Sequence, residues 1–305
     1  MPKDFLTVAD WSADALWSMA ERAAFLRRNH RTGKRPRTLE GRILAMYFEK
    51  PSLRTHVTFE AGIAQLGGHA ILLRPDQVGI GTRESPEDVA RSLSRWVDCI
   101  MARTFSHELV ENLARNASIP VVNGLTDLLH PCQAMADLVT VAGVMKPQDA
   151  AITYVGDGNN VANSLILLAA VLGLELRVAT PASHPPATRI MGQARALARA
   201  SGARISLLED PVEAVRGADF VYTDTWTSMG QEKEAAERRK LFRPYQVNPE
   251  LLSHSRNARF LHCLPAHRGE EVTDEVLDGP RSLVFDQAEN RLHAQNAILE
   301  HLLSA

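Results

Sequence analysis

The stretch FEKPSLRTHVTFE, residues 48–60, decides the fold at the start of the chain. It follows an apolar run, residues 43–48, that is bounded by a Lys-Pro pair and therefore predicts a buried strand. Ser52 is a favourable N-cap, and apolar residues recur at helical spacing over residues 57–66, which predicts a helix. The stretch is thus the end of a strand, a short loop and the start of a helix.

Such a helix start is typical of an anion site. The first backbone N–H groups of a helix have no partner within it, and the helix dipole adds positive potential there. Arg54 adds a cation, and Ser52 and Thr55 add two hydroxyls, so a phosphate is the natural ligand. The alternative is an ordinary capped helix whose Arg54 side chain is solvated.

Outward from this stretch, strands alternate with helices in two rounds. This pattern predicts an α/β protein with two doubly wound parallel-sheet domains joined by interdomain helices. We expect one domain at residues 1–140, completed by a closing helix at 287–305, and a second domain at residues 141–286. Strands are expected at residues 43–48, 69–73, 99–102, 119–122, 151–155, 174–179, 203–208, 219–223 and 259–262, with loops at 74–83 and 224–243.

The composition is that of an ordinary globular protein, with 305 residues of which 45% are hydrophobic and 23% charged. A net charge of −2 gives no argument for nucleic acid or an anionic membrane as a partner. The first ten residues, MPKDFLTVAD, contain no apolar segment of the secretory type, and the longest apolar run, residues 165–174, is too short to span a bilayer. The three cysteines have spacings of neither a disulfide framework nor a zinc site, so we expect a cytoplasmic protein.

Polar residues follow the predicted strands at the point where each strand ends. In open parallel sheets, ligands bind outside the carboxyl ends of the strands, so we expect these residues to line one cleft between the domains. They are Ser52, Arg54, Thr55, Arg103, His130 and Gln133 in the first half, and Asn159, Asn160, Asp224, Ser228, Cys263 and Leu264 in the second.

The turn GDGNNV, residues 156–161, only superficially resembles a dinucleotide fingerprint. Gly156 and Gly158 are present, but Val161 occupies the place of the third glycine, so NAD binding is the weaker interpretation. The asparagines of the turn fit either amide hydrogen bonds to a polar ligand or a helix cap. His130, at a helix start, fits either a plain turn or a neutral imidazole that polarises a carbonyl.

Three residues of the second half also have plainer interpretations. Cys263 fits a small buried side chain, Asp224 fits a helix cap, and Met229 fits a filler of apolar space. The long polar loop at residues 224–243 is either a lid over a ligand or solvated surface.

Taken together, the motifs resemble those of the ornithine carbamoyltransferases. They are FEKPSLRT, ARTF, HPCQ, GDGNNVANS, DTWTSMGQE, HCLPAHRGEEVTDEV and DQAENRLH, in this order from Phe48 to His293. SMGQE and HCLPA are the specific segments, because the related aspartate carbamoyltransferases share the first phosphate motif and the HPxQ motif but lack these two.

The resemblance implies that the first domain binds carbamoyl phosphate and the second binds L-ornithine. Carbamoyl phosphate would be held by Ser52, Leu53, Arg54, Thr55, Arg103, His130, Pro131, Cys132, Gln133, Cys263, Leu264 and Arg291. Ornithine would be bound by Asn160, Asp224, Ser228 and Met229, with the Asp224 carboxylate facing the α-ammonium group.

The implied reaction is attack of the ornithine δ-amine on the carbamoyl carbon, which gives citrulline and phosphate for arginine biosynthesis. Arg54, Arg103 and His130 would stabilise the oxyanion and the leaving phosphate. Asp224 and Cys263 would orient the amine or help to deprotonate it. The resemblance implies no metal and no cofactor, and it implies that the SMGQE loop closes over ornithine.

Three positions depart from the usual family pattern, which has Thr, Arg and Gln where this chain has Leu53, His56 and Gly79. Leu53 is acceptable if its position contributes only a backbone N–H. His56 replaces a permanent cation and would make phosphate affinity sensitive to pH. The family forms homotrimers or multiples of trimers, and Gly79 puts in question the contribution that a neighbouring subunit makes to the site.

Two other functions stay open. The first is a carbamoyltransferase for another amine, such as putrescine or an acylated ornithine, against which Asp224 argues because it fits a free α-ammonium group. The second is a non-catalytic binding protein with the same fold. The intact set Arg54, Arg103, His130, Gln133 and Arg291 argues against it.

Overall fold

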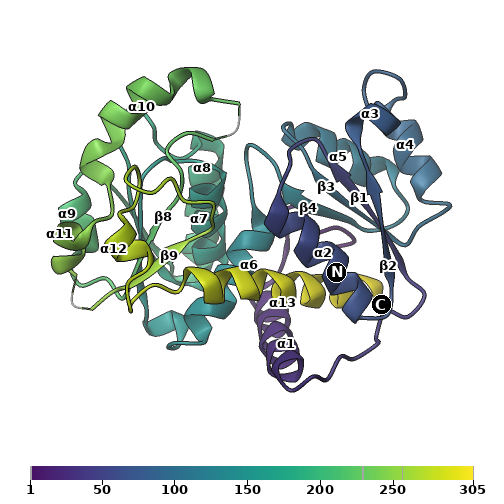
Figure 1. Ribbon diagram of the computed structural model, residues 1–305, viewed down its shortest axis with the longest axis horizontal. Coiled ribbons are helices and arrows are strands. Elements are labelled where there is room, and N and C mark those ends of the chain that lie inside the picture. The colour runs from purple at the N-terminus through teal and green to yellow at the C-terminus, as the bar shows by residue number, and fades with distance from the viewer. Residues whose placement is uncertain (1, 229, 256, 305) are drawn as a thin grey trace. The chain divides into compact units, whose positions relative to one another are not determined.

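The structure is a computed structural model that describes residues 2–228, 230–255 and 257–304. The chain divides into two compact units, one of residues 1–139 with 289–305 and the other of residues 140–288. Each unit contains one parallel sheet with helices on both of its faces (Figure 1). The predicted class, two doubly wound parallel-sheet domains joined by helices, is confirmed.

The sheet of the first unit has four strands in the order β2-β1-β3-β4. The strands are β1 (Ile43–Phe48), β2 (His69–Leu73), β3 (Cys99–Arg103) and β4 (Val121–Leu125). Every neighbouring pair is parallel, and Leu44 of β1 lies opposite Ala70 of β2 and Cys99 of β3. The central strands are buried, which explains their apolar runs, whereas the edge strand β2 is largely exposed.

Serine caps begin several helices of this unit. The Ser52 Oγ accepts a hydrogen bond from the Thr55 N–H at 3.2 Å, and Ser85 and Ser106 cap their helices in the same way. The helices are α1 (Ala13–Arg31), α2 (Leu53–Gln65), α3 (Pro75–Val78), α4 (Pro86–Leu93), α5 (His107–Asn116), α6 (Pro131–Ala142) and α13 (Val284–Leu303). The division between the units falls within α6 and within α13.

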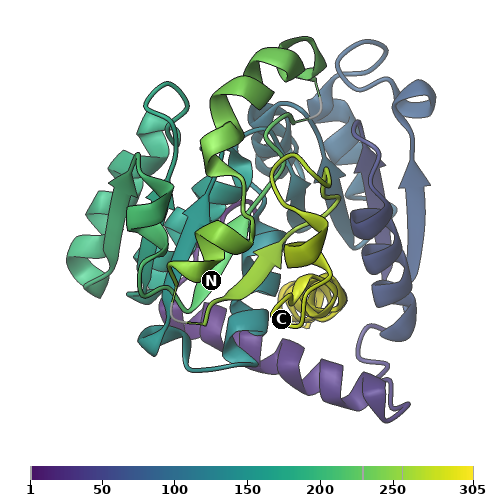
Figure 2. The same cartoon turned by 60° about the vertical axis from the view of Figure 1, so that its left-hand side comes forward.

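The sheet of the second unit has five parallel strands in the order β7-β6-β5-β8-β9. They are β5 (Ala151–Val155), β6 (Glu175–Ala179), β7 (Arg204–Leu208), β8 (Phe220–Thr223) and β9 (Arg259–His262). The helices are α7 (Asn160–Leu172), α8 (Thr188–Ser201), α9 (Pro211–Val215), α10 (Ala235–Phe242), α11 (Pro249–Ser253) and α12 (Asp274–Leu277). Figure 2 shows these elements from a second direction.

Several segments differ from the sequence-based expectation, and one of them is the loop predicted at residues 74–83, which contains α3. The loop predicted at residues 224–243 contains α10, whose buried positions include an arginine, Arg238, and therefore do not follow an apolar pattern. Strand β4 begins and ends later than residues 119–122, because Asn123 is a strand residue: its N–H donates to the Phe5 carbonyl and its side chain donates to the Leu6 carbonyl. No described helix is both long enough and apolar enough to cross a membrane.

Candidate active site

The first unit gathers a cluster of buried cationic and polar side chains at the carboxyl ends of its strands, which we call the anion cluster. Its members come from α2, the end of β3, the start of α6 and α13, and they are Thr55, Arg103, His130, Gln133 and Arg291. All five have exposed fractions between 0% and 7%. Burying two arginines beside one another requires a compensating anion or several acceptors.

The Thr55 hydroxyl is the centre of this cluster. Its Oγ1 accepts hydrogen bonds from Arg103 Nη1 at 3.3 Å and from Arg291 Nη2 at 3.2 Å. The other end of the Arg291 guanidinium donates to Gln133 Oε1 at 2.9 Å, and Gln133 in turn donates to Asp137 Oδ1 at 2.8 Å. Residues up to 236 positions apart in sequence therefore form one connected network.

His130 is a neutral imidazole in this cluster. Burial lowers its pKa well below 6.5, and the charges of Arg291, Arg103 and Arg54 lower it further. Arg291 Nη1 lies 3.5 Å from His130 Nε2. Because a guanidinium can only donate, Nε2 is the acceptor and the proton is assigned to Nδ1.

The residues beside the cluster contribute less through their side chains. The Ser52 Oγ is engaged in capping α2, and the Leu53 side chain is 74% exposed. Cys132 is fully buried, with Sγ 3.4 Å from the Asn123 carbonyl oxygen, and burial raises the pKa of its thiol to about 12. Arg54 and Pro131 lie beside the cluster at the starts of α2 and α6, Arg54 half-buried and Pro131 buried.

The structure explains two of the departures from the family pattern. His56 Nε2 lies 3.0 Å from Glu60 Oε2, one turn further along α2, so His56 has a surface partner of its own. Gly79 has φ +66 at the end of α3, and its carbonyl accepts hydrogen bonds from the N–H groups of residues 82, 83 and 84. A side chain is strained at such a φ, which favours glycine there over the usual glutamine.

Contacts that the motifs did not reveal join the loops leading into the cluster. The buried Lys50, after β1, forms an ion pair with the exposed Asp127, after β4, and its ammonium lies 4.3 Å from the centre of the Phe105 ring, after β3. Glu49 Oε2 accepts a hydrogen bond from the Phe105 N–H at 2.9 Å. Only their positions just after predicted strands could have indicated these residues.

In the second unit, the buried carboxylate of Asp224 lies directly after β8. Its Oδ2 accepts a hydrogen bond from Asn159 Nδ2 at 2.8 Å, and its Oδ1 accepts one from the Cys263 thiol at 2.9 Å. Asn159 Oδ1 caps α7 and also accepts from the Tyr154 hydroxyl at 3.3 Å. Burial, with Asp224 adding to it, raises the pKa of Tyr154 well above 10, so the hydroxyl stays a donor.

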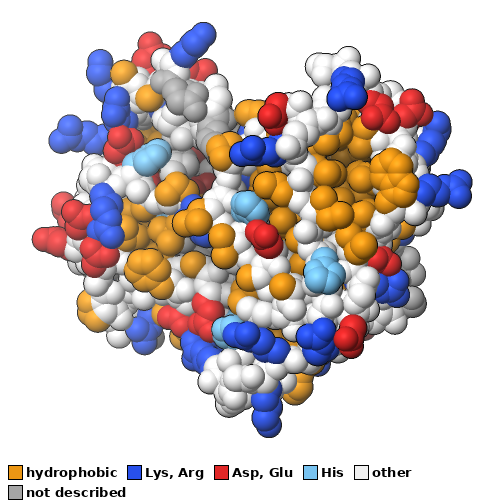
Figure 3. Space-filling model, turned by 45° about the vertical axis from the view of Figure 1, so that its right-hand side comes forward, with side chains coloured by type: hydrophobic (Ala, Val, Ile, Leu, Met, Phe, Trp, Pro, Cys, Tyr) orange, Lys and Arg blue, Asp and Glu red, His pale blue; other side chains and the backbone are white. Residues whose placement is uncertain are grey.

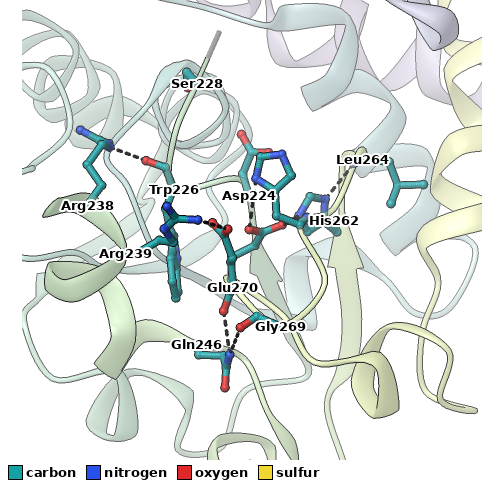
Figure 4. A network of polar contacts seen from close by, with 12 residues as sticks. Asp224, Trp226, Ser228, Arg238, Arg239, Gln246, His262, Leu264, Gly269 and Glu270 are labelled. Atoms are coloured by element: carbon teal, nitrogen blue, oxygen red, sulfur yellow. Dashed lines mark hydrogen bonds and ion pairs between the residues drawn. The ribbon is translucent and has the colours of Figure 1, made fainter. Parts of the chain in front are cut away.

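A second buried pair supports the segment that carries Cys263 and Leu264. His262 Nε2 lies 3.2 Å from Glu271 Oε1, and its Nδ1 accepts a hydrogen bond from the Leu264 N–H at 2.8 Å (Figure 4). Both side chains are completely buried. The pair holds Leu264 in its left-handed conformation, φ 58. Both members lie in the motif HCLPAHRGEEVTDEV, but neither was among the candidate site residues.

The remaining predicted residues of this unit are placed as follows. Asn160 is the half-buried first residue of α7, and Ser228 is half-buried with its N–H donating to Gln231 Oε1 at 3.1 Å. Met229 lies outside the described residues.

Two groups of described side chains bring three metal-ligating atoms within 4.8 Å of one another. In the first, Asp224, His262 and Cys263, both nitrogens of the imidazole already face other partners. In the second, which includes Glu270 and Glu271, Glu270 is paired with Arg239 at 3.1 Å. Neither arrangement requires a metal ion to explain it.

Comparison with known proteins adds to this geometry. The family model described as "Aspartate/ornithine carbamoyltransferase, carbamoyl-P binding domain" matches residues 3–143, and that described as "Aspartate/ornithine carbamoyltransferase, Asp/Orn binding domain" matches residues 148–302.

Individual relatives match over almost the whole chain. An ornithine carbamoyltransferase of Anoxybacillus flavithermus is 52% identical, with 99% of this chain and 96% of the relative covered. One of Pyrococcus furiosus, named as anabolic, is 50% identical over 97% of this chain and 95% of the relative. The solved structure of ornithine carbamoyltransferase from Pyrococcus furiosus superposes with a TM-score of 0.96 at 49% identity, covering 99% of this chain and 97% of that one. The chain therefore belongs to the aspartate/ornithine carbamoyltransferase family, among its ornithine carbamoyltransferases.

Proposed function

We propose that the protein transfers the carbamoyl group of carbamoyl phosphate to the δ-amine of L-ornithine, giving L-citrulline and phosphate in arginine biosynthesis. The observation that carries this proposal is the meeting of Arg103 and Arg291 at the Thr55 hydroxyl, an arrangement built to receive an anion. The family membership and the relative named as anabolic support the reaction and its direction.

The first unit binds carbamoyl phosphate in this proposal. The phosphate lies at the start of α2, held by the backbone N–H groups of residues 52–54 and by the side chains of Arg54, Thr55 and Arg103, while the Thr55 N–H donates to the Ser52 cap. The carbamoyl group lies toward the start of α6, with His130, Gln133 and Arg291 around it. Pro131 and Cys132 contribute backbone only, because the Cys132 sulfur is packed against Asn123.

The second unit binds ornithine in this proposal. The Asp224 carboxylate uses one lone pair on each oxygen for Asn159 and Cys263, which leaves the others for the α-ammonium group. Asn160, Ser228 and Met229 complete the amino-acid site, while the backbone of Cys263 and Leu264 faces the carbamoyl NH₂.

The chemistry follows from these groups. The neutral δ-amine attacks the carbamoyl carbon, a tetrahedral oxyanion forms, and the bond from that carbon to the phosphate oxygen breaks. Arg54, Arg103 and Thr55 stabilise the negative charge that develops on the oxyanion and on the leaving phosphate. Because His130 is neutral, it serves as a hydrogen-bond donor through Nδ1 and does not add a fourth positive charge. The Cys263 thiol, held by its hydrogen bond to Asp224 Oδ1, orients the δ-amine, and the proton that this amine loses passes to the departing phosphate.

We also propose a homotrimer, or a multiple of trimers, in the cytoplasm. The first unit exposes large hydrophobic side chains on α2 and on the edge strand β2, namely Leu53, Val57, Ile71 and Leu72, and Figure 3 shows hydrophobic side chains gathered on the molecular surface. Such a patch supports an interface with a second copy of the chain. Buried free thiols at Cys99 and Cys132 support a reducing compartment. Light scattering after size exclusion tests the trimer against the 33.6 kDa mass of one chain.

A turnover assay tests the reaction. Purified protein is incubated with carbamoyl phosphate and either L-ornithine or L-aspartate, and citrulline or carbamoyl aspartate is measured together with released phosphate. We expect citrulline and phosphate in equal amounts from ornithine and no product from aspartate. Absence of citrulline would overturn the proposal, and carbamoyl aspartate would move the chain to the other branch of the family.

A further inference from the structure

Arg238 is a buried arginine in α10, the helix that follows the segment carrying Ser228. Its exposed fraction is 5%. Its Nε donates to the Trp226 carbonyl oxygen at 2.5 Å (Figure 4), and its Nη2 donates to Asp157 Oδ2 at 2.5 Å. Arginine is rarely buried unless it is paired, so the contacts of this side chain indicate its role.

Asp157 belongs to a rigid part of the unit. It lies in the turn between β5 and α7, and it is 7% exposed. The next residue, Gly158, packs so tightly that a Cβ atom there would lie 2.3 Å from the backbone at Pro185 and Pro186. The residue after it is Asn159, which holds the Asp224 carboxylate. Arg238 is therefore anchored to the same turn that fixes Asp224.

Trp226 lies in sequence between Asp224 and Ser228. Its ring stacks on Phe242 of α10, with ring centres 6.0 Å apart and an interplanar angle of 21°. The Arg238 guanidinium lies 5.2 Å from the centre of the same Phe242 ring. The backbone at Trp226 is thus held on one side by a charge-assisted hydrogen bond and on the other by ring packing.

We propose that Arg238 and Asp157 form a positioning pair that fixes the Trp226 backbone and so keeps Asp224 and Ser228 at the spacing that ornithine requires. This inference rests on the proposed ornithine function of the second unit. Neither side chain touches substrate: Arg238 acts through the Trp226 carbonyl, and Asp157 acts by orienting Arg238.

The contact between Arg238 and Asp157 depends on both side chains being charged. A buried charge that loses its partner is strongly destabilised. Burial raises the pKa of Asp157 to about 6, and the Asp224 charge adds to this effect while Arg238 opposes it. Among the described residues, Glu234, the N-cap of α10, also faces Arg238, with its Oε2 3.7 Å from Nη1, and the His184 ring packs against Phe242. Proton uptake by Asp157 below pH 6 therefore weakens the pair.

The test compares Arg238→Met with Arg239→Met, a matched control in the neighbouring helix position, where the arginine is half-exposed and pairs with Glu270. Methionine keeps much of the apolar stem of the arginine and removes every donor, together with the guanidinium that lies over Phe242. We expect Arg238→Met to raise the KM for ornithine about 10- to 100-fold, in line with losing hydrogen bonds to charged groups, and to leave the KM for carbamoyl phosphate within about 2-fold. Arg239→Met should leave both constants within about 2-fold, because exposed ion pairs contribute little.

Three companion variants make the inference specific. Arg238→Lys should recover part of the ornithine affinity, and Asp157→Asn should raise the ornithine KM in the same direction as Arg238→Met. In the double variant Arg238→Met/Asp157→Asn, the ornithine KM should rise by less than the product of the two single increases, because the two residues act as one unit. We expect the ornithine KM of the wild-type protein to rise as the pH falls below about 6, and Asp157→Asn should flatten that rise.

Limited trypsin cleavage after Lys233, between Ser228 and α10, gives a readout that needs no turnover. Faster cleavage in Arg238→Met and Asp157→Asn than in Arg239→Met supports the positioning pair even if ornithine proves not to be the substrate. Equal cleavage in all variants, equal loss of affinity for both substrates, or multiplicative effects in the double variant would each overturn it. If Arg238→Met does not fold, Arg238→Lys and Asp157→Asn carry the same comparisons.

Discussion

Replacing Asp224 by asparagine should weaken the binding of ornithine and leave the binding of carbamoyl phosphate unchanged. In the folded protein, Asp224 Oδ2 accepts from Asn159 and Oδ1 accepts from the Cys263 thiol, so the carboxylate is already oriented before any ligand arrives. Asparagine has the same shape but no charge. Its oxygen can keep the Asn159 contact while its amide faces the Cys263 sulfur, so we expect the fold to tolerate Asp224→Asn.

The magnitude follows from the contact that is lost. A hydrogen bond between charged groups contributes about 1.5–3 kcal/mol, so losing the contact to the α-ammonium group should raise the KM for ornithine about 10- to 150-fold. The KM for carbamoyl phosphate should stay within about 2-fold, because none of the proposed contacts to it involves the Asp224 side chain.

Steady-state kinetics with two amine substrates check this prediction. Ornithine is compared with 5-aminopentanoate, which has the reacting amine but lacks the α-ammonium group. The substitution should raise the KM for ornithine strongly and the KM for 5-aminopentanoate hardly at all. A similar loss for both amines, or a parallel rise in the KM for carbamoyl phosphate, would refute the assignment of Asp224 to the α-ammonium group.

Three further outcomes are expected. Arg54→Ala should lower kcat about 10²- to 10³-fold, the usual effect of removing an oxyanion donor. His56→Ala should change kcat by less than about 2-fold, because His56 pairs with Glu60 at the surface. Equal losses of kcat for the two variants in a citrulline assay would contradict this prediction. Burial lowers the pKa of His293 from 6.5 to about 4. Between these two pH values the unfolded chain therefore binds a proton that the folded chain does not, so the free energy of unfolding should fall as the pH drops from 6.5 to 4. Urea titrations of His293→Gln should show a smaller fall over this pH range, and an equal fall would exclude His293 as its cause. Gly79→Ala should lower the free energy of unfolding by about 1–2 kcal/mol, since alanine is strained at φ +66, and an unchanged urea midpoint would show that the turn relaxes freely.

The elements that depend on local sequence patterns were predicted best. The apolar run of β1, the Ser52 cap and the start of α2 agree with the structure because each depends on a few neighbouring residues. Alternation of strands and helices predicted both sheets, and the ends of the strands predicted which polar residues gather at the carboxyl ends of each sheet. Helix α10 was missed because one of its inward positions holds Arg238, a charged residue whose burial depends on Asp157, 81 residues earlier.

The contacts that organise the site could not be predicted, because they join residues far apart in sequence. Thr55 and Arg291 are 236 positions apart, and no local pattern indicates that one hydroxyl receives two guanidinium groups. The His262–Glu271 pair spans only nine residues, but the sequence does not indicate that both side chains are completely buried. Asn159 could be recognised as a cap, whereas its second contact, to Asp224, requires the sheet to bring β5 and β8 together.

The most direct measurement is a competition for the carbamoyl group. Labelled carbamoyl phosphate is given to the enzyme with equal concentrations of L-ornithine, putrescine and N-acetylornithine, and the ratio of labelled products reports the ratio of kcat/KM values. Because a site that bonds a charged group rejects analogues without it, citrulline should exceed each other product by at least about 10²-fold. A product mixture dominated by carbamoyl putrescine or by N-acetylcitrulline would contradict the assignment of ornithine as the substrate.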